Sequence, residues 1–162
     1  MSLDQGSAVA LPATTEIKDR IALNERETQA FLASLRCRIC ELTHLQECLD
    51  RVTEEEASLH EQKSLLQLLK GFLAGTHLDA EKRRVSRVRS VILREMELSR
   101  RLLKGRGYWG IDERTRIHYE DIKALTLLDV CGDPEAGEFR ERSTASISQL
   151  RIVQREIEDL RR

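Results

Sequence analysis

Apolar residues in the first part of the chain recur at the alternating spacing of a coiled coil. Over residues 15–73 they follow one another at steps of three, four and seven, which is the seam of a long amphipathic helix. This segment holds no proline, and no glycine before Gly71. The pattern therefore predicts one continuous helix over 15–73. Its seam consists of Phe31, Leu35, Leu42, Leu45, Leu49, Val52 and Leu59.

Three further segments have helical periodicity, and glycine-containing stretches separate them. The predicted helices cover 78–104, 112–130 and 141–162. We expect the second of these to bury one face, made of Leu78, Val85, Val88, Ile92, Met96, Ser99 and Leu103. Gly71–His77 and Gly105–Gly110 are predicted loops. Asp112 is the expected N-cap of the third helix, which should end at Gly132 with Pro134 just beyond it.

These elements predict an all-α fold: an elongated helical hairpin or irregular helical bundle with coiled-coil packing. The short first connection makes the second helix an antiparallel neighbour of the first. Since it is only about 40 Å long at ~1.5 Å per residue, it covers half of the first helix and leaves an overhang. Either the last two helices fold along this overhang or a partner does. Residues 1–13 are expected to be a flexible arm, and 14–162 a single helical domain.

The composition agrees with an all-α fold, and the sequence also limits where in the cell we expect the protein. Ala, Glu, Lys, Leu and Arg supply about half of the chain, whereas aromatic residues supply only 4%. Such a composition is typical of long helices and argues against an all-β fold. No run of ~18 apolar residues predicts a membrane span. The first residues resemble neither a secretory signal nor a transit peptide, so we expect an intracellular protein, cytoplasmic or cytoskeletal, with the nucleus as an alternative.

Charge is concentrated in the second predicted helix, although the whole chain has a net charge of only −1. Segment 78–106 carries ten basic and four acidic residues. One interpretation is pairing with the acidic side chains of the first helix, Glu47 and Glu54–Glu56. The other is a surface for nucleic acid or another acidic polymer, since arginine suits bidentate phosphate contacts. The candidate anion-binding residues are Arg83, Arg87, Arg94, Arg101 and Arg106.

Cys37, Cys40, His44 and Cys48 have the residue types of a zinc site. Their spacing is also helical, and on an unbroken helix the outer two lie ~16 Å apart at 1.5 Å per residue. One tetrahedral ion cannot gather all four ligands over that length. We therefore favour a small-residue packing face and no metal, and keep these four residues as metal candidates for a zinc-binding adaptor, the third hypothesis.

Two short motifs invite a chemical interpretation. Gly105–Gly110 matches G-x-G-x-x-G, but the phosphate fingerprint requires a preceding strand, and a helical pattern precedes this one. Arg83-Arg84-Val85-Ser86 matches the acceptor pattern of arginine-directed kinases, and a phosphate there would change the charge of the helix. No HExxH, GxSxG or Walker motif is present, so we expect neither an enzyme nor a bound cofactor.

The leading hypothesis is a non-catalytic structural or assembly subunit, a scaffold component that binds helical proteins, a filament or a second copy of itself through coiled-coil surfaces. We expect Leu150→Glu with Ile157→Glu to abolish partner binding while helicity persists. The runner-up is a nucleic-acid or ribonucleoprotein-associated subunit that uses the arginines of the second helix. The predicted partner-binding residues are Phe31, Leu35, Leu42, Trp109, Ile147, Leu150, Ile157 and Leu160.

Overall fold

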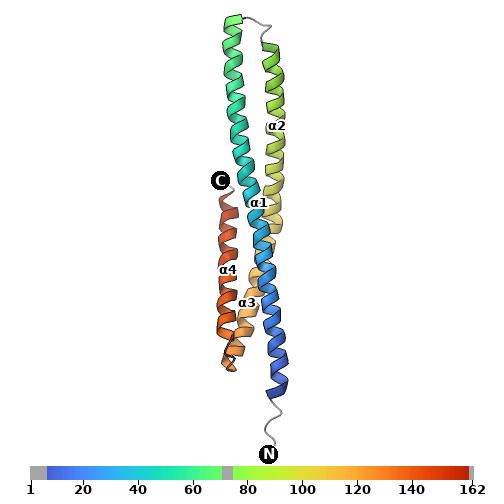
Figure 1. Cartoon of the computed structure of the whole chain (residues 1–162), viewed down its shortest axis with the longest axis vertical. Helices are drawn as coiled ribbons and strands as arrows, with labels where there is room; N and C mark the ends of the chain where they lie inside the picture. The colour runs from blue at the N-terminus through green and yellow to red at the C-terminus, as the bar shows by residue number, and fades with distance from the viewer. Residues whose placement is uncertain (1–6, 71–74, 161–162) are drawn as a thin grey trace, which may run out of the picture. The chain divides into compact units, whose positions relative to one another are not determined.

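The chain is all-α in the computed structural model, as the periodicity predicts (Figure 1). The structure describes residues 7–70 and 75–160, with side chains over 14–66, 68–69 and 78–160. The helices are α1 (Ser7–Lys70), α2 (Gly75–Leu102), α3 (Tyr108–Val130) and α4 (Ala136–Asp159), and the π-helix η2 (Leu103–Gly107) connects α2 to α3. They divide into two compact units.

The first unit, here called the bundle, spans Met1–Cys37 and Leu103–Arg162. In it the first part of α1 packs with η2, α3 and α4, and α3 and α4 lie side by side and antiparallel (Figure 1). The apolar seam of α4 is buried against its neighbours, as expected of an amphipathic helix. The buried apolar residues of the bundle are Ile21, Leu32, Leu35, Leu103, Ile111, Leu125, Ala136, Ile147, Leu150, Val153 and Ile157.

Polar contacts fix how the helices of the bundle pair. Lys18 on α1 bonds to Asp133 and to Glu135, each at 3.0 Å, and so ties α1 to the connection between α3 and α4. The two carboxylates raise the pKa of Lys18, and Lys18 in turn lowers the pKa of Asp133. Further along α1, Glu25 pairs with Arg142 of α4 at 2.7 Å. The last two helices therefore fold along the first part of α1 within the same chain.

The second unit, here called the hairpin, spans Arg38–Leu102. The second part of α1 and α2 lie antiparallel in it (Figure 1). Only Leu42, Val85 and Met96 are buried apolar side chains among its described residues. A pair of helices with so small a core is expected to open locally more readily than the bundle.

Several predicted boundaries are wrong. Helix α1 begins at Ser7, within the stretch predicted as a flexible arm, and ends at Lys70. Part of the predicted first turn, 71–74, lies outside the described residues, and α2 begins at Gly75. Helix α4 begins at Ala136, five positions before the prediction. There the Asp133 carboxylate accepts a hydrogen bond at 2.9 Å from the amide of Glu135, the N-cap residue of the helix.

The prediction of a loop over Gly105–Gly110 is also wrong, because the backbone is helical there. Gly107 is buried, and a Cβ added to it would lie 3.5 Å from Leu35 and 3.6 Å from Ile157. Gly110 lies against the ring of Phe31. These glycines permit close helix approach rather than a turn. Asp112 consequently lies inside α3 and is not its N-cap. The predicted end of the third helix is confirmed, since Gly132 follows Cys131 with a φ of +89°.

Candidate functional site

Most residues predicted to bind a partner belong to the interior of the chain. Leu35, Leu42, Ile147, Leu150 and Ile157 are all buried. The prediction that they form exposed stripes is therefore wrong. In the bundle, α3 and α4 cover the first part of α1, whereas Leu42 is buried within the hairpin.

The three other predicted partner-binding residues differ in exposure. Phe31 is half-buried beside Gly110, and Leu160 is half-buried at the end of α4. Trp109 alone of the predicted set is well exposed, at 72%. Its predicted role as an anchor for a partner stays a prediction.

A different apolar surface is exposed, on α2 in the hairpin. Its residues recur at steps of three, seven and four, which is heptad spacing. We call this set the outer stripe; it consists of Val88, Val91, Leu98 and Leu102. Each is at least 39% exposed, and Val91 is 61% exposed. In heptad notation Val88 and Leu102 occupy a, and Val91 and Leu98 occupy d.

The outer stripe lies on a different side of α2 from the residues that pack on α1. At ~100° per residue, buried Val85 and Met96 lie on one side of the helix, and Val91 and Leu98 lie well away from them. The sequence prediction placed Val88 on the inner face, but Val88 is 41% exposed. Periodicity shows both apolar stripes of α2, and only the packing shows which one is covered.

Arginines follow the outer stripe at intervals of seven residues. Arg87, Arg94 and Arg101 occupy the three successive g positions beside it, and we call them the arginine row. All three are exposed. Arg101 pairs with Glu97 at 2.9 Å, and Arg87 Nε donates to the Arg83 carbonyl at 3.4 Å. Arg94 makes no ion pair or hydrogen bond with any residue that the structure describes.

Of the other predicted anion-binding residues, Arg83 belongs to the exposed side of α2 and Arg106 is exposed in η2. Arg83 Nε donates to the Asp79 carbonyl at 3.3 Å. The structure places Arg106 in the bundle and Arg83, Arg87, Arg94 and Arg101 in the hairpin. These four lie within ~40° of one another on α2 at ~100° per residue.

Cross-helix pairing, the first interpretation of the basic helix, is present in the hairpin and uses Glu55 and Glu56. Arg84 lies 3.7 Å from Glu55, and Arg89 lies 3.9 Å from Glu56. Lys63, near the end of α1, also pairs with Asp79 of α2. Pairs as exposed as these contribute little to stability, but they bias which helices pair and in which register.

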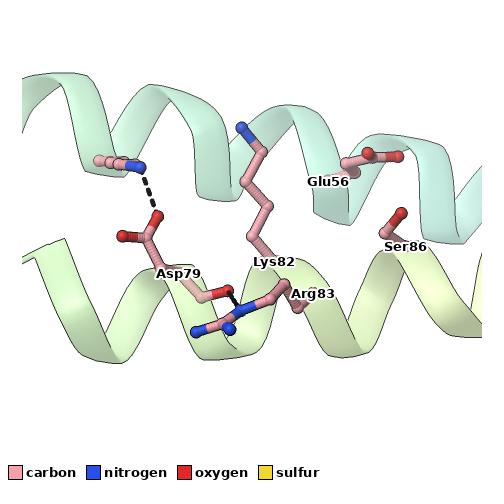
Figure 2. Close-up of a pocket in the computed structure, with 6 residues that line it drawn as sticks. Glu56, Asp79, Lys82, Arg83 and Ser86 are labelled. Carbon is pink, nitrogen blue, oxygen red and sulfur yellow. Dashed lines mark hydrogen bonds and ion pairs between the residues drawn. The ribbon is translucent and has the colours of Figure 1, made fainter.

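The groove between the two helices of the hairpin is polar. It has a volume of about 430 Å³ and is lined by Glu56, Lys63, Asp79, Lys82, Arg83 and Ser86. Figure 2 shows Lys82 reaching across from α2 toward α1, and Ser86 pointing toward Glu56. Lys82 Nζ also lies 3.2 Å from Nδ1 of His60. The groove therefore combines cations and carboxylates and has no strong single-sign character.

The four metal candidates lie along unbroken helix α1. Cys48 Sγ is 3.7 Å from His44 Nε2, and Arg51 donates to that sulfur at 3.4 Å. Among the described residues, no group of three or more His, Cys, Asp or Glu is arranged to hold a metal ion. Cys37, Cys40 and His44 are exposed and Cys48 is half-exposed, so the proposed small-residue packing face is wrong.

A buried polar cluster in the bundle was not predicted from the sequence. His118 and Thr28 are fully buried and share a hydrogen bond of 2.8 Å. Asn24 donates to both carboxylate oxygens of buried Asp121, at 3.3 and 3.0 Å. Burial lowers the pKa of His118. The cluster lies inside the bundle and joins α1 to α3, which indicates a role in helix pairing.

Comparisons of this chain with known proteins find no match. No protein-family model matches the chain, and neither the curated proteins nor the solved structures give a match. Within the described residues, no helix combines the length and apolar character that crossing a bilayer requires.

Proposed function

We propose that this chain is a non-catalytic assembly subunit that binds one acidic amphipathic helix of another protein along the outer stripe of α2. The observation that carries the proposal is the heptad arrangement of exposed Val88, Val91, Leu98 and Leu102 on a helix whose other apolar face is already packed. An apolar a/d seam at the surface is the usual receptor for a second helix.

The arginine row supports the choice of an acidic partner. Residues at g positions face charged positions of a partner helix in a coiled coil, and opposite charges there favour pairing. Arg87, Arg94 and Arg101 would meet three successive acidic positions. Arg94, which has no partner among the described residues, is the most available of them. Glu95 occupies the a position between Val88 and Leu102; a polar residue there fixes register at some cost in affinity.

The test is binding of a synthetic helix to the full chain at low salt. The probe peptide carries leucine at a and d and glutamate at e and g, and isothermal calorimetry measures its Kd. We expect a Kd on the order of micromolar, because four apolar side chains bury a small seam. Val91→Glu with Leu98→Glu should weaken binding at least about tenfold.

A matched control separates loss of the stripe from loss of fold. Leu127→Glu changes a leucine that is 69% exposed on α3; it belongs to the bundle and not to the unit that carries the outer stripe, and the change should leave binding unchanged. All variants should keep the circular dichroism of the parent. Equal binding by the parent and the Val91/Leu98 double variant would reject the proposal. Light scattering would reveal pairing with a second copy in place of the peptide.

A second candidate function is nucleic-acid binding through the exposed face that Arg83, Arg87, Arg94 and Arg101 share. It predicts affinity that falls steeply with salt, as expected of up to about four phosphate contacts. No aromatic residue of α2 offers a stacking platform, which makes this the weaker candidate. Co-purification with and without nuclease distinguishes the two candidates, because only the nucleic-acid function loses its partners to nuclease.

A further inference from the structure

Ser86 is an exposed serine preceded by basic residues, and the proposed function assigns it no role. It follows Lys82, Arg83 and Arg84 in the sequence, so basic side chains stand two, three and four residues before it. Its side chain is exposed and lines the groove of the hairpin (Figure 2). An enzyme with an acidic substrate-binding surface can recognise such a serine, because its carboxylates pair with the two guanidinium groups that precede the hydroxyl.

The Ser86 hydroxyl is not engaged within the helix. Other exposed hydroxyls bond back one turn: Thr53 donates to the Leu49 carbonyl at 2.8 Å and Ser90 donates to the Ser86 carbonyl at 3.0 Å. Ser86 Oγ donates to no residue that the structure describes. Its oxygen is therefore available to an external reagent.

We propose that Ser86 is the acceptor site of an arginine-directed serine kinase. Ser86 Oγ attacks the γ-phosphorus of ATP, and the bond between that phosphorus and the β,γ-bridging oxygen breaks. ADP leaves, and the hydroxyl proton passes to the catalytic carboxylate of the kinase. Guanidiniums of Arg83 and Arg84 pair with carboxylates of the kinase and place the hydroxyl.

The hairpin is the part of the chain suited to such a reaction. A kinase binds its acceptor segment in an extended form, so α2 must open over about two turns. The described part of the hairpin buries only Leu42, Val85 and Met96 as apolar side chains. Local opening is cheapest where few apolar contacts are lost.

The modification would change the groove and leave the outer stripe in place. A phosphate adds about −1.5 to −2 charges beside Glu56, which pairs with Arg89 at 3.9 Å. Ser86 precedes Val88 by two residues and so faces a different side of α2, at ~200° of rotation. The inference therefore does not depend on the proposed function.

The experiment treats the full chain with ATP and the catalytic subunit of cyclic-AMP-dependent protein kinase as the probe. We expect one phosphate per chain by intact mass, located on Ser86 by peptide fragmentation. Ser86→Ala should abolish incorporation. Arg83→Gln with Arg84→Gln should slow it at least about tenfold, because both charge-assisted contacts are lost.

Two controls keep the result specific to this site. Ser90→Ala removes the next serine, which has Arg87 three residues before it, and should leave incorporation unchanged. Arg100→Gln removes an arginine of the same helix outside the motif and should also leave it unchanged. No incorporation in the parent chain, or incorporation that survives Ser86→Ala, would overturn the proposal.

Discussion

His118 Nε2 lies 2.8 Å from Thr28 Oγ1, and both side chains are fully buried inside the bundle. The other ring nitrogen, Nδ1, makes no hydrogen bond with any residue that the structure describes and lies 4.0 Å from Asp121 Oδ2. A buried imidazole with one unpaired nitrogen is costly unless its position is otherwise required. We infer that this pair helps to fix the register of α1 against α3, and we expect protonation of His118 to destabilise the bundle.

Stability of the bundle should fall as the pH drops below about 6.5, the ordinary pKa of histidine. Burial lowers the pKa of His118; Arg114 acts in the same direction, and Asp121 and Glu25 oppose it. The unfolded chain thus takes up its proton at a higher pH than the folded chain. Stability is full above the ordinary pKa and is lost as the pH falls toward the folded-state pKa.

The measurement compares urea denaturation at about pH 7.5 and about pH 5.5 in the parent and in His118→Gln. The variant cannot titrate at this position, so its stability should change less between the two pH values. Carboxylates such as Asp133 titrate at lower pH and affect both proteins alike. An identical pH dependence in the two proteins would refute the role of His118.

Gly110→Ala should destabilise the bundle. An added Cβ would lie 2.5 Å from Cζ and 2.7 Å from Cε2 of the Phe31 ring, so the ring or the helix must shift. Overpacking of this kind costs about 1–3 kcal/mol, measured as a lower Tm.

Gly105→Ala provides the matched control, because its Cβ would meet nothing within 4 Å. It should stabilise the chain by about 0.5–1 kcal/mol, the usual gain for replacing a helical glycine. Phe31→Leu should relieve the cost of Gly110→Ala in a double-mutant cycle. A Gly110→Ala variant as stable as the parent would show that α3 does not approach α1 this closely.

Leu150→Glu with Ile157→Glu should unfold the bundle, the reverse of the expectation from sequence. Both side chains are buried on α4, at 0% and 2% exposure, and two unpaired carboxylates cannot be accommodated there. Circular dichroism should show a large loss of helicity. Retained helicity with full thermal stability would mean that α4 is not packed as described.

Charge exchange across the arginine row should switch the peptide specificity. Arg87→Glu with Arg94→Glu should weaken binding of the glutamate-flanked probe by about tenfold and should favour a matched probe with lysine at e and g. Calorimetry with both peptides at two salt concentrations measures the effect. If the variant discriminates between the probes as the parent does, the row does not face the partner.

The α2 helix shows which parts of the candidate site can be predicted from the sequence and which cannot. Its apolar positions predict a helix with a core face, and Val85 and Met96 are confirmed as core. Val88 was assigned to the same face, although it belongs to the outer stripe. Periodicity alone cannot distinguish the covered apolar stripe of a helix from the exposed one, since both have heptad spacing. Leu150 shows the opposite error. The sequence predicts it as part of an exposed seam, but it is buried in the bundle.

The helical character of this chain, the end of α3 and the residues that form apolar seams can all be predicted from the sequence, because they depend on local propensity and on spacing. The helical backbone at Gly105–Gly110 depends on tertiary packing, since close helix approach at Gly107 and Gly110 outweighs the local preference of glycine for turns. Tertiary packing also determines which apolar seams are covered within the chain. That outcome depends on contacts between residues far apart in sequence, such as Thr28 with His118 and Phe31 with Gly110, which no local pattern encodes.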